Sequence, residues 1–402
     1  MSRVRLAAFV AVVCAAGLAA ADELADKLAP HVGQPLDVIE LGTGKRFVRP
    51  ILEKVVERAG KTTALRIRPE GEPRGITLTL PAIVKIAAGR ETIHEAEAKG
   101  KGAAQARGRK AREAYEKQLA ESHERMTAQG VSPWPALDAA AHESEVDDLE
   151  RFVATVREAF PALQVAETHE FIVASDIPPP QMAPYVASLD SMHDFLCDLY
   201  AIPRGEPVWK GKCLVIAFRQ EADFAAFESR FMKVESRGTH GLCHQRTDGR
   251  VIMACHRGDD DAAFAHMLVH ETSHGFNHRW LSPQRLPNWL NEGIAEWVGT
   301  QVVARSNQVQ LKEAQALDFM RTQGTLGPGF FEADNIQPVQ YGMASSLVKF
   351  LVARDRRRFA RFVQAIKEGV PVEESLEDAF DASLDDLVAA YGKAINVPAL
   401  RR

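Results

Sequence analysis

The segment His270-Glu271-Thr272-Ser273-His274 constrains the fold of this chain more than any other feature. Two histidines four positions apart share a face of a helix, where both imidazoles can bind one zinc ion. Glu271 then lies one position on, beside the metal, where a carboxylate can act as a general base. The pattern predicts a helix here, and a chain of 402 residues with 46% hydrophobic content can bury the core that holds it.

A second helix is predicted around residues 288–297. Zinc in a catalytic site takes three protein ligands and keeps one position open. We expect Glu292 to be the third ligand, beside His270 and His274. Glu296 lies one helical turn further on, where it could accept a hydrogen bond from a ligand imidazole and fix its tautomer. The alternative, that Glu296 is an ordinary surface acid, stays open.

These motifs resemble those of the gluzincin metallopeptidases. Residues 270–274 match the H-E-x-x-H helix of that group, and residues 289–293 match the W-L-N-E-G segment of the aminopeptidase N group, in which the Glu is the third zinc ligand. Thermolysin-like enzymes share the two-helix arrangement, with an acidic residue four positions after the ligand, as Glu296 is here. The resemblance implies one Zn2+ per chain, bound by His270, His274 and Glu292, with Glu271 as the general base.

A third match covers residues 341–347, which are similar to the Y-x-K-G-A-x-x-L segment of the same group. Its tyrosine steadies the tetrahedral intermediate, so the resemblance implies a catalytic role for Tyr341. An aromatic residue at the start of an apolar helix can also be part of the core, and this alternative stays open. His266 and His278 continue the four-residue spacing of His270 and His274, and we interpret them as structural or supporting groups.

The resemblance extends from about Trp134 to the C-terminus, where the chain looks like the peptidase-MA-like domains of exported bacterial proteins. It implies a peptide or protein substrate. The 17 residues between His274 and Glu292 are one fewer than the aminopeptidase N group usually has. In that group a G-A-M-E-N segment holds the amino terminus of the substrate, and no such segment precedes the helix at 270–274 here. Aminopeptidase activity is therefore not implied, and an endopeptidase fits equally well.

The predicted fold class is α+β, with a gluzincin-type peptidase domain and a helical C-terminal part. We expect a small β-barrel-like module over residues 22–89, with strands at 36–41, 64–67 and 76–86. A charged helical linker follows at 90–130, and its basic cluster at 99–112 is interpreted as a solvated face. The α/β peptidase domain is predicted over 131–310 and the helical part over 311–402.

Residues 1–21 have the pattern of a signal peptide. Arg3 and Arg5 precede an uncharged run at 6–21, and the small residues Ala19 and Ala21 suit cleavage before Asp22. The sequence predicts an exported protein, periplasmic or secreted, without a membrane span after cleavage. The run is short for the roughly 20 residues of a membrane helix, so an uncleaved anchor is the less favoured alternative.

Export permits disulfides among the remaining cysteines. Cys243 and Cys255 flank a turn at Asp248-Gly249, and we expect a disulfide between them across a hairpin. A second zinc site formed by these two cysteines with His244 and His256 is the alternative, but adjacent residues on a strand point to opposite faces. The strand at 251–256 is expected to lie at the edge of the cleft, where it could pair with an extended peptide.

The charge of the chain excludes some partners. With 49 Lys and Arg against 54 Asp and Glu, the net charge of -5 gives no field that favours nucleic acid or an anionic membrane. Two further function classes stay open: an inactive zinc-binding scaffold, and a zinc hydrolase of non-peptide bonds. The presence of Glu271, which zinc binding alone does not require, argues against the scaffold. The sequence indicates no oligomeric state.

Overall fold

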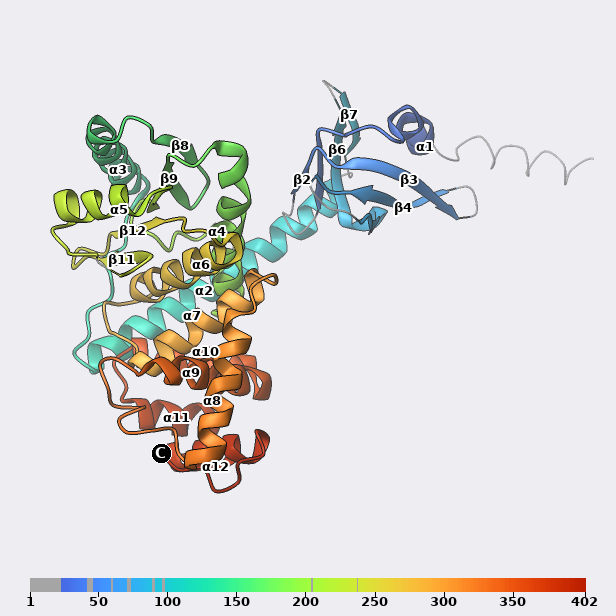
Figure 1. Ribbon diagram of the computed structural model, residues 1–402. Helices are drawn as coiled ribbons and strands as arrows, with labels where there is room; N and C mark the ends of the chain where they lie inside the picture. The colour runs from blue at the N-terminus through green and yellow to red at the C-terminus, as the bar shows by residue number, and fades with distance from the viewer. Residues whose placement is uncertain are drawn as a thin grey trace, which may run out of the picture. The chain divides into compact units, whose positions relative to one another are not determined.

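The computed structural model describes residues 23–41, 46–58, 61–70, 74–88, 91–95, 98–203, 205–236 and 238–402 (Figure 1). The chain divides into two compact units, Met1–Ala114 and Tyr115–Arg402, and the boundary falls within helix α2 (Ala98–Ala128). The predicted signal peptide and its cleavage site lie outside the described residues. Within the described part, no helix has both the length and the apolar character needed to cross a membrane. The prediction of a mixed α+β protein is confirmed.

The first unit contains a short helix and two antiparallel sheets. One sheet has the strand order β2-β1-β6-β7 and the other β3-β4-β5. Their shared core is aliphatic and includes Leu36, Ile39, Leu65 and Ile86. The elements are α1 (Glu23–Leu28), β1 (Val38–Leu41), β2 (Arg46–Val48), β3 (Ile51–Arg58), β4 (Lys61–Arg68), β5 (Ile76–Thr79), β6 (Ile83–Ala88) and β7 (Glu91–Glu95).

The β-barrel predicted for this unit is wrong, because the described strands form two sheets and close no barrel. The run 76–86, expected to be one strand, is interrupted by a 3-10 turn at Leu80–Ala82. Pro81 lies in this turn and has no backbone N–H to donate to a sheet. The chain therefore passes from one sheet to the other at this point: β5 pairs with β4, and β6 pairs with β1 and β7.

The second unit is built on a mixed five-stranded sheet with the order β11-β12-β10-β9-β8. The three inner strands are parallel, and both edge strands run antiparallel to their neighbours. The inner strands are buried along their whole length, as their continuous apolar sequences require. The strands are β8 (Gln164–Glu167), β9 (Phe171–Ser175), β10 (Cys213–Phe218), β11 (Gly241–Gln245) and β12 (Val251–His256).

Helices cover both faces of this sheet (Figure 1). Helices α3 (Ala139–Ala159) and α5 (Glu221–Phe227) pack on one face, against the side of the strands that carries Ile216 and Ile252. Helices α4 (Pro179–Leu199) and α6 (Asp261–Arg279) pack on the other face, with Val215 and Met253. A short π-helix, Glu228–Met232, extends α5. The zinc-motif helix α6 is therefore anchored to a rigid sheet.

The structure corrects two expectations about the hairpin. Strand β12 lies between β10 and β11, so the edge strand is β11 and not residues 251–256. The turn spans residues 246–250, and this register places Met253 opposite Cys243 and Gly241 opposite Cys255. The two cysteines are offset by two positions, and Cys197, Cys213, Cys243 and Cys255 are all free thiols, so the predicted disulfide is absent.

The helical part covers α6 from the side away from the sheet. Its helices are α7 (Asn288–Val302), α8 (Gln308–Gln323), α9 (Pro338–Arg354), α10 (Arg356–Lys367), α11 (Val372–Phe380) and α12 (Leu384–Ala394). Helix α9 contacts both α7 and α8 closely. At Gly293 the approach is so close that an added Cβ would overlap the backbone carbonyl of Ala344. This contact fixes the second zinc-motif helix against α9.

The later half of α2 is a largely exposed helix, as its composition predicted, but one side of it packs against the second unit. Tyr115 packs against the core of the second unit, and Met126 is fully buried. Arg125 forms a two-pronged ion pair with Glu368, with N···O distances of 2.6 and 2.7 Å. Most of the basic cluster at 99–112 lies outside the described side chains, and its interpretation as a solvated face stays a prediction.

Candidate metal centre and cleft

The helix that carries His270, Glu271 and His274 has clear start and stop signals. Asp260 caps its first turn by accepting hydrogen bonds from the backbone N–H groups of Ala262 and Ala263 at 2.8 and 3.0 Å. Apolar residues at helical spacing, among them Phe264, Leu268 and Val269, bury one face of α6 in the core. The opposite histidine-bearing face is thereby turned toward α7.

The structure brings the three predicted metal ligands together. The Nε2 atoms of His270 and His274 lie 3.1 Å apart. Oε2 of Glu292 lies 3.2 Å from Nε2 of His270 and 3.4 Å from Nε2 of His274. Ligand atoms about 2.0–2.2 Å from a tetrahedral zinc ion are about 3.3–3.6 Å from one another, so the three atoms are spaced as a zinc site requires.

The chemistry of these atoms also suits a cation. Oε2 of Glu292 is buried and accepts no hydrogen bond, although two ring nitrogens lie near it. Burial raises the pKa of Glu292, but the close approach of the imidazoles of His270 and His274 outweighs burial and holds the pKa well below its usual range. Burial lowers the pKa of His274, yet Glu292 outweighs this effect and raises it to about 9. Two imidazoles and an ionised carboxylate that share one point are the donor set that zinc prefers.

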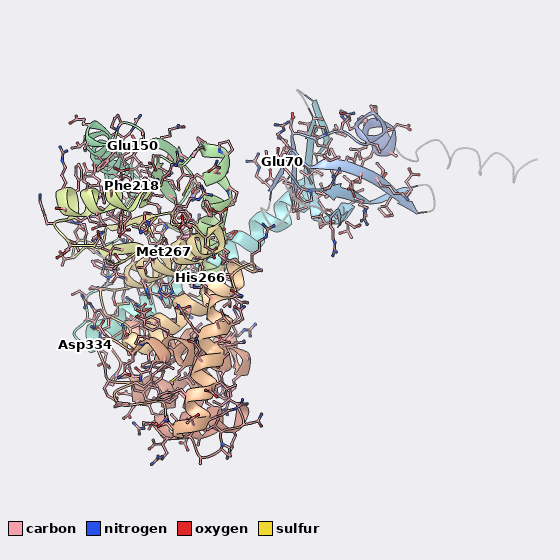
Figure 2. The ribbon with its side chains drawn as sticks, viewed as in Figure 1. Glu70, Glu150, Phe218, His266, Met267 and Asp334 are labelled. Carbon is pink, nitrogen blue, oxygen red and sulfur yellow. The ribbon has the colours of Figure 1, made fainter. Side chains whose placement is uncertain are left out.

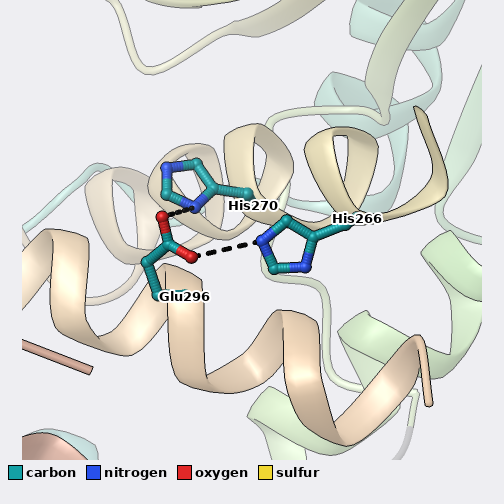
Figure 3. Close-up of side chains that lie close together, drawn as sticks. All are labelled: His266, His270 and Glu296. Carbon is teal, nitrogen blue, oxygen red and sulfur yellow. Dashed lines mark hydrogen bonds and ion pairs between the residues drawn. The ribbon is translucent and has the colours of Figure 1, made fainter. Parts of the chain in front are cut away.

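The carboxylate of Glu296 contacts the rings of both His270 and His266, as Figure 3 shows. Its Oε1 is 3.8 Å from Nδ1 of His270, which is ion-pair rather than hydrogen-bond distance, and its Oε2 is 3.3 Å from Nε2 of His266. The Glu296 side chain is 1% exposed. Nδ1 of His274 has no hydrogen-bond partner, so only one of the two imidazoles is backed by a carboxylate.

Lys312, a partly exposed residue, also joins this cluster, and sequence reasoning missed it. Its Nζ, from α8, pairs with Oε1 of Glu296 and lies 5.6 Å from the ring centre of Tyr341. Burial raises the pKa of Glu296, but the hydrogen bond from His266 and the charges of His270 and Lys312 outweigh it and hold the pKa at about 2. Glu296 is therefore ionised at neutral pH and not a solvated surface acid.

Tyr341 and Glu271 lie next to the ligand set. Burial, followed by the charges of Glu292, Glu296 and Glu271, raises the pKa of Tyr341 to about 12. Its hydroxyl therefore keeps its proton at neutral pH and can donate a hydrogen bond. The charge of Glu271 acts on both His274 and Tyr341, which places this half-buried carboxylate at the same centre.

A cleft of about 1010 Å3 opens beside the ligand set, with His274 and Asn291 in its lining. One wall is the edge strand β11 and the turn that follows it, residues 243–247. The loop 332–335 also lines the cleft, and one of its residues, Asp334, is labelled in Figure 2. Asn277, hydrogen-bonded to Asn291 at 3.3 Å and to Tyr200 at 3.0 Å, links α4, α6 and α7 at its floor. Nothing in the sequence predicted that these asparagines would lie at the cleft.

The other histidines on or near α6 have structural partners. Nε2 of His278 lies 3.2 Å from the carbonyl of Arg246, and its own carbonyl accepts from the indole of Trp134. His244 pairs with Glu228, and His256 stacks on His240. Within the described part of the chain, the alternative zinc site at the two Cys-His pairs is not formed. Two overlapping groups of side chains in the described part of the chain could hold a metal. One is His270, His274 and Glu292, and the other is His266, His270 and Glu296.

No protein-family model and no curated protein sequence matches this chain. The fold and the site alone describe the kind of protein this is. It has a unit of helices packed on a mixed sheet, in which two packed helices bring two histidines and a glutamate together beside a polar cleft.

Proposed function

We propose that this protein is a zinc-dependent metallopeptidase of the gluzincin type. The observation that carries the proposal is the meeting of His270, His274 and Glu292 within 4.8 Å of one another at the side of a cleft. A purely structural zinc site is closed by four protein ligands, whereas three ligands beside a cleft leave a position for a reactant. Zn2+ bound there would polarise a carbonyl and lower the pKa of water.

The roles of the surrounding side chains follow from their chemistry. Glu271 accepts the proton of the attacking water and delivers it to the leaving amine. Tyr341, protonated at neutral pH, donates a hydrogen bond to the oxygen on which negative charge develops. Glu296, ionised and held by His266 and Lys312, orients the ring of His270.

An extended peptide is the substrate class that the cleft favours. Strand β11 lies at the edge of the sheet and forms one wall of the cleft, so its outer backbone groups can pair with an added strand. The cleft is lined mainly by polar side chains, including Arg246, Asn291 and Glu332. These features suit a peptide backbone with hydrophilic side chains. Export, inferred from residues 1–21, remains part of this proposal.

Cleavage of a peptide library by the zinc-loaded full chain tests the proposal. Glu271→Gln keeps the size of the side chain but cannot take up a proton, so we expect turnover to fall by about two to four orders of magnitude with zinc retained. Tyr341→Phe should lower kcat by about 100- to 1,000-fold with little change in KM.

Glu150→Gln is the matched control, because it changes an exposed carboxylate of α3 that does not line the cleft, and it should leave kcat within a few-fold. Equal turnover by wild type and Glu271→Gln would assign the hydrolysis to another site. Cleavage of esters but not of any peptide would identify a zinc hydrolase of non-peptide bonds. A chain that binds zinc but cleaves nothing would be a scaffold.

A further inference from the structure

A second cavity lies beside the C-terminal end of α6 and shares no lining residue with the metal cleft. Its volume is about 280 Å3. Its lining includes four large aromatic side chains, Tyr115, Trp134, Trp209 and Trp280, and the guanidinium-bearing side chain of Arg279. A cavity of this size suits a ligand built on a single ring.

The aromatic walls are fixed before any ligand arrives. Trp280 stacks on Tyr200 with ring centres 4.0 Å apart, and Trp209 packs edge-on against Phe276 at 5.7 Å. The indole of Trp134 donates a hydrogen bond to the carbonyl of His278 at 3.0 Å. A preformed apolar wall costs little ordering entropy when a flat ligand binds to it.

Arg279 is a cation without a counter-charge. Its guanidinium lies 5.4 Å from the ring centre of Trp134, its Nε is buried without a hydrogen-bond partner, and no acid of the described residues forms an ion pair with it. Burial lowers the pKa of Arg279 to about 10, which still leaves it charged at neutral pH. A buried charge of this kind is costly unless an anion joins it.

Three more buried polar atoms of the lining residues have no partner, one of them Nε1 of Trp280. Nε1 of Trp209, in a residue that is 2% exposed, donates to nothing, and Nδ1 of His142 is likewise unpaired. Buried indole N–H groups usually find an acceptor. The cavity is therefore lined by residues whose buried polar atoms and positive charge the protein itself does not pair.

We propose that this cavity binds a small carboxylate with a flat apolar body, its carboxylate at Arg279 and its ring between the tryptophans. A guanidinium and a carboxylate form charge-assisted hydrogen bonds, which are stronger than neutral ones. Glu206 is the one acid in the lining, and its charge acts on Tyr115. An organic cation is the competing ligand, which aromatic walls also suit, and the test includes one.

Calorimetry and tryptophan fluorescence on the zinc-loaded full chain test the proposal, with 3-phenylpropionate as the probe. We expect one site per chain with a dissociation constant of about 0.1–1 mM, as ligand efficiency allows for so small a molecule. The neutral 3-phenylpropionamide should bind about 10- to 100-fold more weakly. Equal or tighter binding of the amide or of 3-phenylpropylamine, or no saturable binding of the acid at millimolar concentration, would overturn the proposal.

Variants separate this cavity from the metal centre, which could also hold a carboxylate. Arg279→Met should weaken the binding of 3-phenylpropionate about 10- to 100-fold. It should not lower the melting temperature, since it removes a charge that lacks a partner. Arg285→Met is the matched control, because it removes a cation of the metal cleft. This variant should bind 3-phenylpropionate as tightly as the wild type does. Binding that survives Arg279→Met but is lost in Glu292→Gln would place the probe at the metal centre and refute the proposed site.

Discussion

At the scale of single residues, Glu296 is the most informative side chain outside the ligand set. A fully buried carboxylate is stable only when it is paired, and Glu296 has His266, His270 and Lys312 around it. Because it faces Nδ1 of His270, it can hold that ring in the orientation in which Nε2 points at the metal position. His266, which only continued a four-residue spacing in the sequence, is the partner that holds Glu296 from the other side.

Glu296→Gln tests this positioning role. The amide keeps the shape but removes the charge, so we expect zinc affinity to fall by about 10- to 100-fold. Competition with a chromophoric chelator measures the change. Glu313→Gln is the control, since this acid of α8 bonds Ser345 and not the site. Complete loss of zinc would instead make Glu296 a direct ligand, and unchanged affinity would make it a purely structural acid.

That the three proposed ligand residues lie together could be predicted because the evidence is local: His270 and His274 share a helix face, and Glu292 follows in a recognisable context. Lys312 could not be predicted, because its partner Glu296 lies on a different helix and no spacing rule joins the two. The same is true of Asn277, which meets Asn291 only when α6 and α7 pack together. Residues that support a site from another element leave no pattern in the sequence.

At the scale of elements, the packing of α6 on α7 depends on a glycine. A Cβ added at Gly299 would overlap the imidazole of His266, so this glycine makes the room in which His266 reaches Glu296. Gly299→Ala should therefore lower the free energy of unfolding by about 1–3 kcal/mol, because overpacking displaces a buried side chain. Urea unfolding monitored by circular dichroism measures this change.

The double variant Gly299→Ala with His266→Ala provides the matching control. The smaller side chain at 266 removes the overlap, so the cost of adding the methyl group should largely disappear in that background. A Gly299→Ala penalty that is equal in both backgrounds would show that His266 is not what the glycine accommodates.

Elements that have strong local sequence signals lie where the sequence predicts them. Features that depend on which strands pair with each other do not. Helix α6 contains residues 270–274 and strand β12 spans Val251–His256, as the sequence predicts, because a capping acid marks the helix and a buried apolar run marks the strand. The edge position of β11 and the register of its hairpin depend on which strand adds to which edge. The predicted Cys243–Cys255 disulfide was wrong for this reason, since a shift of two positions separates the thiols.

At the scale of the whole molecule, Lys367 ties the C-terminal helices to the loop between the two zinc-motif helices. Its Nζ donates to the carbonyls of Ser282 and Gln284 at 2.6 and 2.7 Å, and the residue is 1% exposed. Burial, followed by the charge of Arg279, lowers the pKa of Lys367 from 10.5 to about 7. The loop that sets the spacing of His274 and Glu292 is thus held by a buried amine.

This amine gives the protein a pH-dependent stability. Between pH 7 and pH 10.5 the unfolded chain holds a proton on Lys367 that the folded chain has lost, so the free energy of unfolding should rise with pH, by up to about 1.4 kcal/mol per pH unit. Urea unfolding at pH 7, 8 and 9 measures the slope. Lys367→Met should abolish this contribution, and the exposed control Lys349→Met should keep it. A wild-type slope that Lys367→Met leaves unchanged would contradict the assignment.

The central claim is that His270, His274 and Glu292 together hold one zinc ion, and metal analysis of the purified chain tests it most directly. We predict one zinc per chain in the wild type and in Glu271→Gln, and less than about a tenth of that after dialysis of His270→Ala, His274→Ala or Glu292→Ala, because removal of one of three ligands cripples such a site. Full zinc occupancy in Glu292→Ala, or a wild-type chain that takes up no zinc, would contradict the account.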